Sequence, residues 1–340
     1  MPAAEVTAES LPADELMPLV AARSAAQLTV LMPLYRQERF VAEAVESVLA
    51  QQGVTCHIVI SDDNSQDRTL QFAIDAVVRA KGEHPHAVSV RRGTTRLRRW
   101  HLQRLIEQTG ADIVVQAHGD DRSLPGRMLA LFEAFHDHHA AVVVSRFRTI
   151  DASGSLIADR SDDTGSLDHS TRLGVRPVLF DEALSRPAWG IGSVEAWRTE
   201  SLRSFQALNP QFAPMSHDRL LLIRGALLGR AILVERALID RRRHDDNWSS
   251  HLIDSSTASR TRHGWALVRV LLFATVMQDI DDAERGRAIR ARSARIARAA
   301  TQSLLTTALT ALRSAHGDLL TVGERLIWLA EDSEDEAAPQ

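Results

Sequence analysis

The chain has 340 residues, of which 44% are hydrophobic and 25% charged, a composition that excludes a mainly disordered protein. Its formal net charge of −4 argues against nucleic-acid binding as the main activity, because a polyanion requires a basic surface. The single cysteine, Cys56, excludes an internal disulfide and a zinc site built from cysteines.

The ends of the chain carry no recognisable targeting or membrane signal. Residues 1–27 are acidic and lack a continuous apolar stretch, which predicts a flexible N-terminal arm and no secretory signal. The apolar run at 267–277 is interrupted by Arg269 and is shorter than the roughly 20 residues that span a bilayer. We therefore expect a cytoplasmic protein without a transmembrane helix.

Apolar runs alternate with segments of helical periodicity through the first half of the chain. Strands are expected at 28–34, 57–60, 87–93 and 111–117, and helices at 38–52, 70–80 and 100–110. This alternation predicts a parallel sheet with helices on both faces, whose ligands gather at the carboxyl ends of the strands. Further along, we expect a strand at 142–150, an irregular loop at 160–175, a helix at 217–228, a strand at 231–236 and mainly helix beyond 256.

Polar residues follow three of the expected strands, after Leu31, Ile60 and Ala117. The third cluster, HGDD, places Asp120 and Asp121 side by side at the end of a buried strand. Two adjacent carboxylates repel unless a cation or a hydrogen-bond donor takes up their charge. The sequence therefore indicates a partner for this pair, although an N-cap with a solvated neighbour would explain it as well.

Four ordered motifs resemble those of family 2 glycosyltransferases. They are LTVLMPLYRQERFVAEAVESVLAQ, VISDDNSQDRTL, HGDDRSLPGRM and SHDRLLLIRGALLGRAILVERALIDRRRHDDNWS, which together cover 28–250. The resemblance implies an α/β fold of the GT-A type, with a mixed sheet flanked by helices and a helical C-terminal extension. The implied domains are the arm at 1–27, a glycosyltransferase domain at 28–250 and a helical region at 251–340. Within 28–250, the nucleotide-sugar half spans 28–155 and the acceptor half 156–250.

The resemblance also implies an activity: inverting transfer of a sugar from a nucleotide-diphosphate donor to a hydroxyl acceptor, with Mg²⁺ or Mn²⁺ as cofactor. A cell-surface or secreted glycan or a glycolipid is the expected acceptor, and polysaccharide biosynthesis the expected process. A lipid-linked acceptor would bring the protein to the inner face of the membrane. For the arginine-rich C-terminal helices, a solvated face, a lipid surface and an oligomer contact remain open.

Site residues follow from the matching positions. The resemblance implies that Asp121 and His244 hold the metal, that Asp120 faces the ribose and that Asp218 is the catalytic base. The remaining donor-binding residues are Pro33, Tyr35, Asp63 (with Asp62 as the alternative) and Arg99, the last chosen for the diphosphate from among Arg92, Arg96, Arg98 and Arg99. Turn formation, helix capping and simple solvation are the structural explanations for the same residues.

Two departures from the family pattern support an alternative function. His118 stands where many relatives have an aspartate, and His217 replaces the acidic residue before the base. These changes leave open a nucleotide-sugar binding protein of the same fold with impaired catalysis. A dinucleotide-binding enzyme ranks lower, because no GxGxxG follows the first strand.

Overall fold

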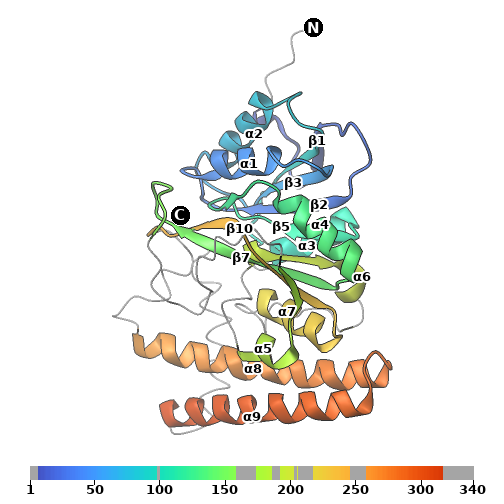
Figure 1. Ribbon diagram of the computed structural model, residues 1–340. Helices are drawn as coiled ribbons and strands as arrows, with labels where there is room; N and C mark the ends of the chain where they lie inside the picture. Colours follow the sequence, from blue (N-terminus) through green and yellow to red (C-terminus); the bar gives the residue numbers. More distant parts are fainter. Residues whose placement is uncertain are drawn as a thin grey trace. The chain divides into compact units, whose positions relative to one another are not determined.

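The computed structural model describes residues 7–97, 100–157, 174–185, 192–202, 205, 217–245 and 258–316 (Figure 1). The chain forms two compact units. Unit 1 contains residues 1–206 and 218–244, and unit 2 contains 207–217 and 245–340.

A mixed sheet forms the centre of unit 1, with strand order β1-β4-β3-β2-β5-β9-β7-β10-β6 and β8 paired to β10. The strands are β1 (Leu16–Val20), β2 (Leu28–Leu34), β3 (Cys56–Asp62), β4 (Ala87–Arg92), β5 (Ile113–Gln116), β6 (Arg122–Ser123), β7 (Val142–Ile150), β8 (Val175–Pro177), β9 (Glu195–Arg198) and β10 (Ala231–Arg242). The pairs β4–β3, β3–β2, β2–β5 and β7–β10 are parallel, and the other pairs are antiparallel.

Helices connect the strands as the sequence pattern predicts. They are α1 (Val41–Leu49), α2 (Thr69–Arg79), α3 (Trp100–Thr109), α4 (Arg127–His138), α5 (Phe180–Ser185), α6 (Thr199–Leu202) and α7 (His217–Leu227), with short 3-10 turns η1 (Ala8–Ser10) and η3 (Gly192–Val194). Alternate strand residues such as Val30 and Met32 share one core with apolar residues of α1, α2 and α4. Each such fully buried side chain contributes about 1.5–3 kcal/mol of stabilisation, which fixes the strands and hence the turns at their ends.

The flexible arm predicted for residues 1–27 is wrong for its second half. Leu16–Val20 form β1, which pairs antiparallel with β4 and closes that edge of the sheet. Met17 and Leu19 pack against the core, and Pro18 is tolerated because β1 is an edge strand. Burial of these side chains outweighs the polar character of the surrounding sequence.

Strand β9 is another feature of the sheet that the sequence pattern does not reveal. Its four residues lie antiparallel between β5 and β7 and join the two parallel parts of the sheet. Within unit 2, α8 (Ala258–Arg285) packs against α9 (Ala291–His316), and Arg298 of α9 binds Asp281 and Glu284 of α8. Among the described residues, every helix is too short or too polar to cross a membrane.

Candidate active site

The polar turns after β2, β3 and β5 meet at the carboxyl edge of the parallel strands. The backbone N–H of Asp63 donates to the carbonyl of Leu34 at 2.9 Å, which joins the turn after β3 to the end of β2. The turn after β5 packs tightly against the end of β2 at Gly119. A Cβ on this glycine would lie 2.5 Å from Cδ2 of Leu34 and 2.6 Å from Oε1 of Gln37. The predicted convergence is therefore present for these three turns.

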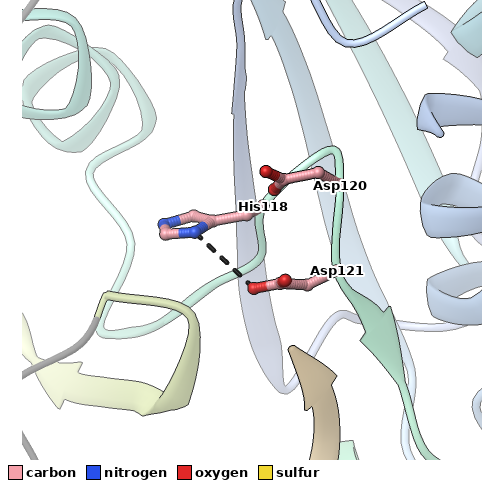
Figure 2. A group of neighbouring side chains, drawn as sticks. All are labelled: His118, Asp120 and Asp121. Atoms are coloured by element: carbon pink, nitrogen blue, oxygen red, sulfur yellow. Dashed lines mark ion pairs between the residues drawn. The ribbon is translucent and has the colours of Figure 1, made fainter. Parts of the chain in front are cut away.

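His118, Asp120 and Asp121 form a compact cluster in the turn between β5 and β6 (Figure 2). One potential ligand atom from each residue lies within 4.8 Å of the others, and Nδ1 of His118 is 3.7 Å from Oδ2 of Asp121. Asp121 is 7% exposed, whereas the imidazole of His118 is partly open to solvent. We call His118, Asp120 and Asp121 the acidic turn.

The two carboxylates of the acidic turn titrate in opposite directions. Burial raises the pKa of Asp121, and the negative charge of Asp120 raises it further. Burial also acts to raise the pKa of Asp120, but the hydrogen bond with His244 and the charges of His118 and His244 outweigh it and lower the pKa overall. Opposite pKa shifts are expected when two neighbouring carboxylates repel each other and the nearby positive charge stabilises only one of them. Two carboxylates and an imidazole at this spacing fit a divalent cation.

Strand β10 holds the acidic turn in place through Arg242. Its backbone N–H donates to Oδ1 of Asp121 at 2.9 Å, and its Nε donates to the carbonyl of Asp120 at 3.0 Å. The guanidinium also binds Glu43 of α1. Because the Arg242 side chain is 2% exposed, these bonds are protected from water and fix the turn between α1 and β10.

His244 approaches the same turn from just beyond the end of β10. Its Nε2 lies 3.2 Å from Oδ2 of Asp120, and its ring stacks at a tilt on Phe40 with the centroids 4.5 Å apart. The sequence hypothesis paired His244 with Asp121 at the metal, but the described contact of His244 is with Asp120. Adjacent ligands on an octahedral ion at about 2.1 Å lie about 3 Å apart, so Nε2 and Oδ2 already have that spacing.

Asp240, two residues before Arg242 on β10, is the centre of a second hydrogen-bond network. Asp240 is 0% exposed and accepts hydrogen bonds from Arg122 at 2.7 and 2.9 Å and from Arg148 at 2.6 and 2.8 Å. Arg122 also donates to Glu43 at 2.9 Å. The residue that directly follows Asp121 is thereby tied to both α1 and β10.

The turns after β2 and β3 hold the residues assigned to the nucleoside. Oδ1 of Asp63 accepts a 2.6 Å hydrogen bond from the backbone N–H of Leu97. Asp62 accepts from Ser65 N–H at 2.8 Å through Oδ2, while its buried Oδ1 has no hydrogen-bond partner among the described residues. Burial raises the pKa of Asp62. Either carboxylate lies at the expected strand end, so the geometry leaves the choice between them open.

Pro33 and Tyr35 lie at the end of β2, and both are partly buried. The guanidinium of Arg96 lies 3.8 Å from the ring centroid of Tyr35, a cation–π distance. Arg96 is thus the described member of the arginine group that reaches a predicted donor-binding residue.

Several predicted positions lie outside the described residues. Arg99, Arg98 and Trp189 are among them, as is most of the expected loop at 160–175. Asp218 lies in the first turn of α7, as predicted, but its side chain and that of His217 are not described.

Sequence reasoning missed Arg242, Asp240, Glu43 and Gln116. The spacing of Asp240, Arg242 and His244 could have indicated that these side chains lie together. Residues two apart on a strand face the same side of the sheet. Glu43 gave none, since its partners lie 79 and 199 residues away.

Comparison with known proteins extends these observations. The chain is 32% identical over 110 residues to "Uncharacterized protein MT1568" of Mycobacterium tuberculosis, covering 32% of this chain and 33% of that protein. It is 27% identical over 180 residues to "Putative glycosyltransferase EpsE" of Bacillus subtilis, covering 52% of this chain and 63% of that protein. The chain therefore spans less than two thirds of the length of either relative.

A similar solved structure shows the same fold. TarS 1-349 of S. aureus, crystallised in complex with UDP-GlcNAc, has a TM-score of 0.51 and 14% identity, covering 84% of this chain and 91% of that chain. The sequence profile named Glycosyl transferase family 2 matches residues 29–180, which include β2 to β5 and the acidic turn. Over these residues, which make up less than half of the chain, the protein is similar to glycosyl transferase family 2.

Proposed function

We propose that this protein transfers a sugar, with inversion, from a nucleotide-diphosphate donor to a hydroxyl acceptor with the help of a divalent cation. The observation that carries the proposal is the acidic turn, where His118, Asp120 and Asp121 gather at the end of β5 within a glycosyl transferase family 2 domain. The turns after β2 and β3 lie at the same edge of the sheet, which is where the ligands of parallel α/β sheets bind.

In this proposal the nucleoside binds between the turns after β2 and β3. Pro33 and Tyr35 contact the base and ribose, Asp63 accepts a hydrogen bond from the base, and Asp120 faces the ribose hydroxyls. The existing bond from Leu97 N–H to Asp63 orients that carboxylate at the end of β3.

Asp121 holds the cation, with His244 as its second ligand and Asp120 beside them. Mg²⁺ or Mn²⁺ bound here would neutralise the charge that develops on the departing diphosphate. The position of the buried Asp121 carboxyl beside Asp120 and His118 supports this assignment, because two carboxylates and an imidazole so close together suit a divalent cation. Arg99 is proposed to contact the diphosphate.

Inversion requires a base on the face of the sugar opposite the leaving diphosphate. Asp218, in the first turn of α7, is proposed to take the proton of the acceptor hydroxyl as the oxygen attacks the anomeric carbon. The proposed acceptor is a glycan or glycolipid. Cytoplasmic action, at the inner face of the membrane when the acceptor is lipid-linked, belongs to the same proposal.

Donor hydrolysis without an acceptor tests the proposal. UDP-, dTDP- and GDP-sugars are incubated with Mg²⁺ or Mn²⁺, and the released nucleotide is measured for the wild type, Asp121→Ala and Asp137→Ala. Asp137 is an exposed aspartate of α4 and serves as the control. We expect metal-dependent hydrolysis of at least one donor, lowered about 100-fold by Asp121→Ala and unchanged by the control.

Equal hydrolysis by Asp121→Ala would overturn the metal assignment. The alternative function has its own signature, which His118 and His217 motivate: calorimetric binding of a nucleotide sugar without turnover across a panel of acceptors. That result would identify a nucleotide-sugar binding protein with impaired catalysis.

A further inference from the structure

His118 gives the acidic turn a nitrogen donor beside the two carboxylates of Asp120 and Asp121. We propose that His118 binds the divalent cation through Nδ1 and biases the site away from Mg²⁺ toward first-row transition ions such as Mn²⁺ and Co²⁺. This inference rests on the proposed function, because it concerns the cation of the same site.

The imidazole is already close to the spacing that a shared ion needs. Nδ1 of His118 lies 3.7 Å from Oδ2 of Asp121, and adjacent ligands of an octahedral ion lie about 3 Å apart. We expect a rotation of the partly exposed imidazole to close that difference. Asp121 itself is held by the backbone N–H of Arg242, so the carboxylate provides the fixed side of the pair.

The other ring nitrogen of His118 has a buried orienting partner. The side-chain nitrogen of Gln116, the last residue of β5, lies 3.0 Å from Nε2 of His118. In this arrangement the amide N–H donates and Nε2 accepts, so the ring proton is on Nδ1 and faces Asp121. Metal binding at Nδ1 requires the opposite tautomer, with the proton on Nε2.

Gln116 can form a hydrogen bond with either tautomer of His118. Its amide has a donor nitrogen and an acceptor oxygen, and turning the amide by half a turn exchanges their positions. Its Oε1 is buried and has no hydrogen-bond partner among the described residues, so turning the amide breaks no bond of that oxygen. After the turn, Oε1 accepts the proton of Nε2. An outer partner of this kind commonly orients a metal-binding histidine.

The backbone around Gln116 is shaped to hold this amide. A Cβ on Gly192 would lie 2.6 Å from Nε2 of Gln116, so a glycine is required where η3 crosses the amide. Arg127 donates at 2.7 Å to the carbonyls of both Gln116 and Ser193 and fixes the two segments together. The backbone that carries the amide is therefore fixed, and the Gln116 side chain is buried.

An imidazole changes which ions the site prefers. Mg²⁺ favours an octahedron of oxygen ligands and gives up its water reluctantly. Affinity for a mixed nitrogen and oxygen site rises from Mn²⁺ to Co²⁺ along the first transition row. Replacing a carboxylate oxygen by Nδ1 of His118 is therefore expected to weaken Mg²⁺ binding relative to both of these ions.

Direct metal binding tests the inference without any turnover. Full-length protein freed of metal is titrated with MnCl₂, CoCl₂ and MgCl₂ by calorimetry, and free Mn²⁺ is followed by electron paramagnetic resonance. The variants are His118→Asp, which replaces the imidazole by a carboxylate, His118→Asn, and His136→Asn, an exposed histidine of α4 as control. We expect the ratio of Co²⁺ to Mg²⁺ affinity to fall at least 10-fold in His118→Asp and to stay unchanged in His136→Asn.

A spectroscopic arm identifies the ligand atom. The spectra are recorded in a His244→Asn background, which removes the other proposed nitrogen ligand. Electron spin-echo modulation of Mn²⁺ bound to this variant should show ¹⁴N coupling, and the coupling should disappear when His118→Asp is added. Gln116→Leu should weaken Mn²⁺ binding about 10-fold or more while leaving His118 in place. Should either His118 substitution fail to fold, the Gln116→Leu titration still decides the outcome.

The results separate this inference from the proposed function. Metal binding with the same ion preference in the wild type and in His118→Asp, and no ¹⁴N signal from residue 118, would overturn the role of His118 and leave the glycosyltransferase proposal intact. Absence of metal binding by the wild type would overturn both metal assignments, and donor hydrolysis would then decide the proposed activity.

Discussion

Arg242 at the end of β10 holds Asp121: its backbone N–H donates to Oδ1 of Asp121 at 2.9 Å although the two residues are 121 positions apart. Its side chain reaches the carbonyl of Asp120 and the carboxylate of Glu43. The acidic turn is thus positioned by a strand that enters the sheet late in the sequence.

Substituting Arg242 by methionine tests this positioning role. Arg242→Met keeps the backbone bond to Asp121 but removes the side-chain bonds, and leaves Glu43 without one of its two arginines. We expect Mn²⁺ to bind about 10-fold more weakly and the free energy of unfolding to fall by about 1–3 kcal/mol. Calorimetry and urea unfolding measure the two effects.

Arg241→Met is the matched control, because Arg241 is the neighbouring residue and lies over Phe147 instead of the acidic turn. Equal loss of Mn²⁺ affinity in both variants would show that Arg242 has no special role. A loss of stability without a change in Mn²⁺ affinity would make Arg242 a purely structural residue.

Asp240 is expected to be the most sensitive carboxylate of the fold. Asp240→Asn removes the negative charge that faces Arg122 and Arg148, and a partly buried pair that loses one partner is destabilised by about 3 kcal/mol. Glu235→Gln offers the comparison, since Glu235 is 39% exposed and should cost less than about 1 kcal/mol. Similar unfolding midpoints in urea for these two variants would contradict the buried network.

The histidine pKa values predict an acid-sensitive fold. Burial, with help from the positive charge of Arg91, lowers the pKa of His101 from 6.5 to about 4. The native state therefore keeps His101 neutral where the unfolded chain binds a proton, so stability falls as pH drops from about 6.5 toward 4. The contribution of His101 amounts to about 2 kcal/mol between pH 7.5 and 5.

His101→Gln isolates that contribution, because the amide can still pair with Ser61, whose Oγ lies 2.7 Å from Nε2 of His101. The difference in unfolding free energy between pH 7.5 and 5 should shrink by about 2 kcal/mol in the variant. Other histidines, such as the buried His86, respond in the same direction but are present in both proteins and cancel. An unchanged pH dependence would show that His101 titrates normally.

The local pattern of the sequence was enough to predict the parallel part of the sheet. The strands β2 to β5, the helices between them and the convergence of their polar ends follow from apolar periodicity and from the rule for parallel strands. The acidic turn was predicted as well, because two adjacent aspartates after a buried strand need a partner.

Long-range pairing decided what the sequence pattern did not reveal. Strand β9 has only four residues, and its place between β5 and β7 depends on the neighbouring strands and not on its own periodicity. The bonds that link Glu43 and Arg242 join α1 to β10, so no local spacing could have indicated them. The roles assigned to the individual site residues, including Asp218 and Arg99, remain predictions.

Nucleotide binding with and without metal is the most direct test of the central claim, that a cation at the acidic turn holds the donor's diphosphate. UDP, dTDP and GDP are titrated calorimetrically into the wild type and Asp121→Asn, first with MnCl₂ and then with EDTA. We expect at least one nucleotide to bind the wild type about 10-fold or more tightly with Mn²⁺, and Asp121→Asn to bind it equally weakly in both conditions. Equal affinity of the wild type with Mn²⁺ and with EDTA would contradict the claim.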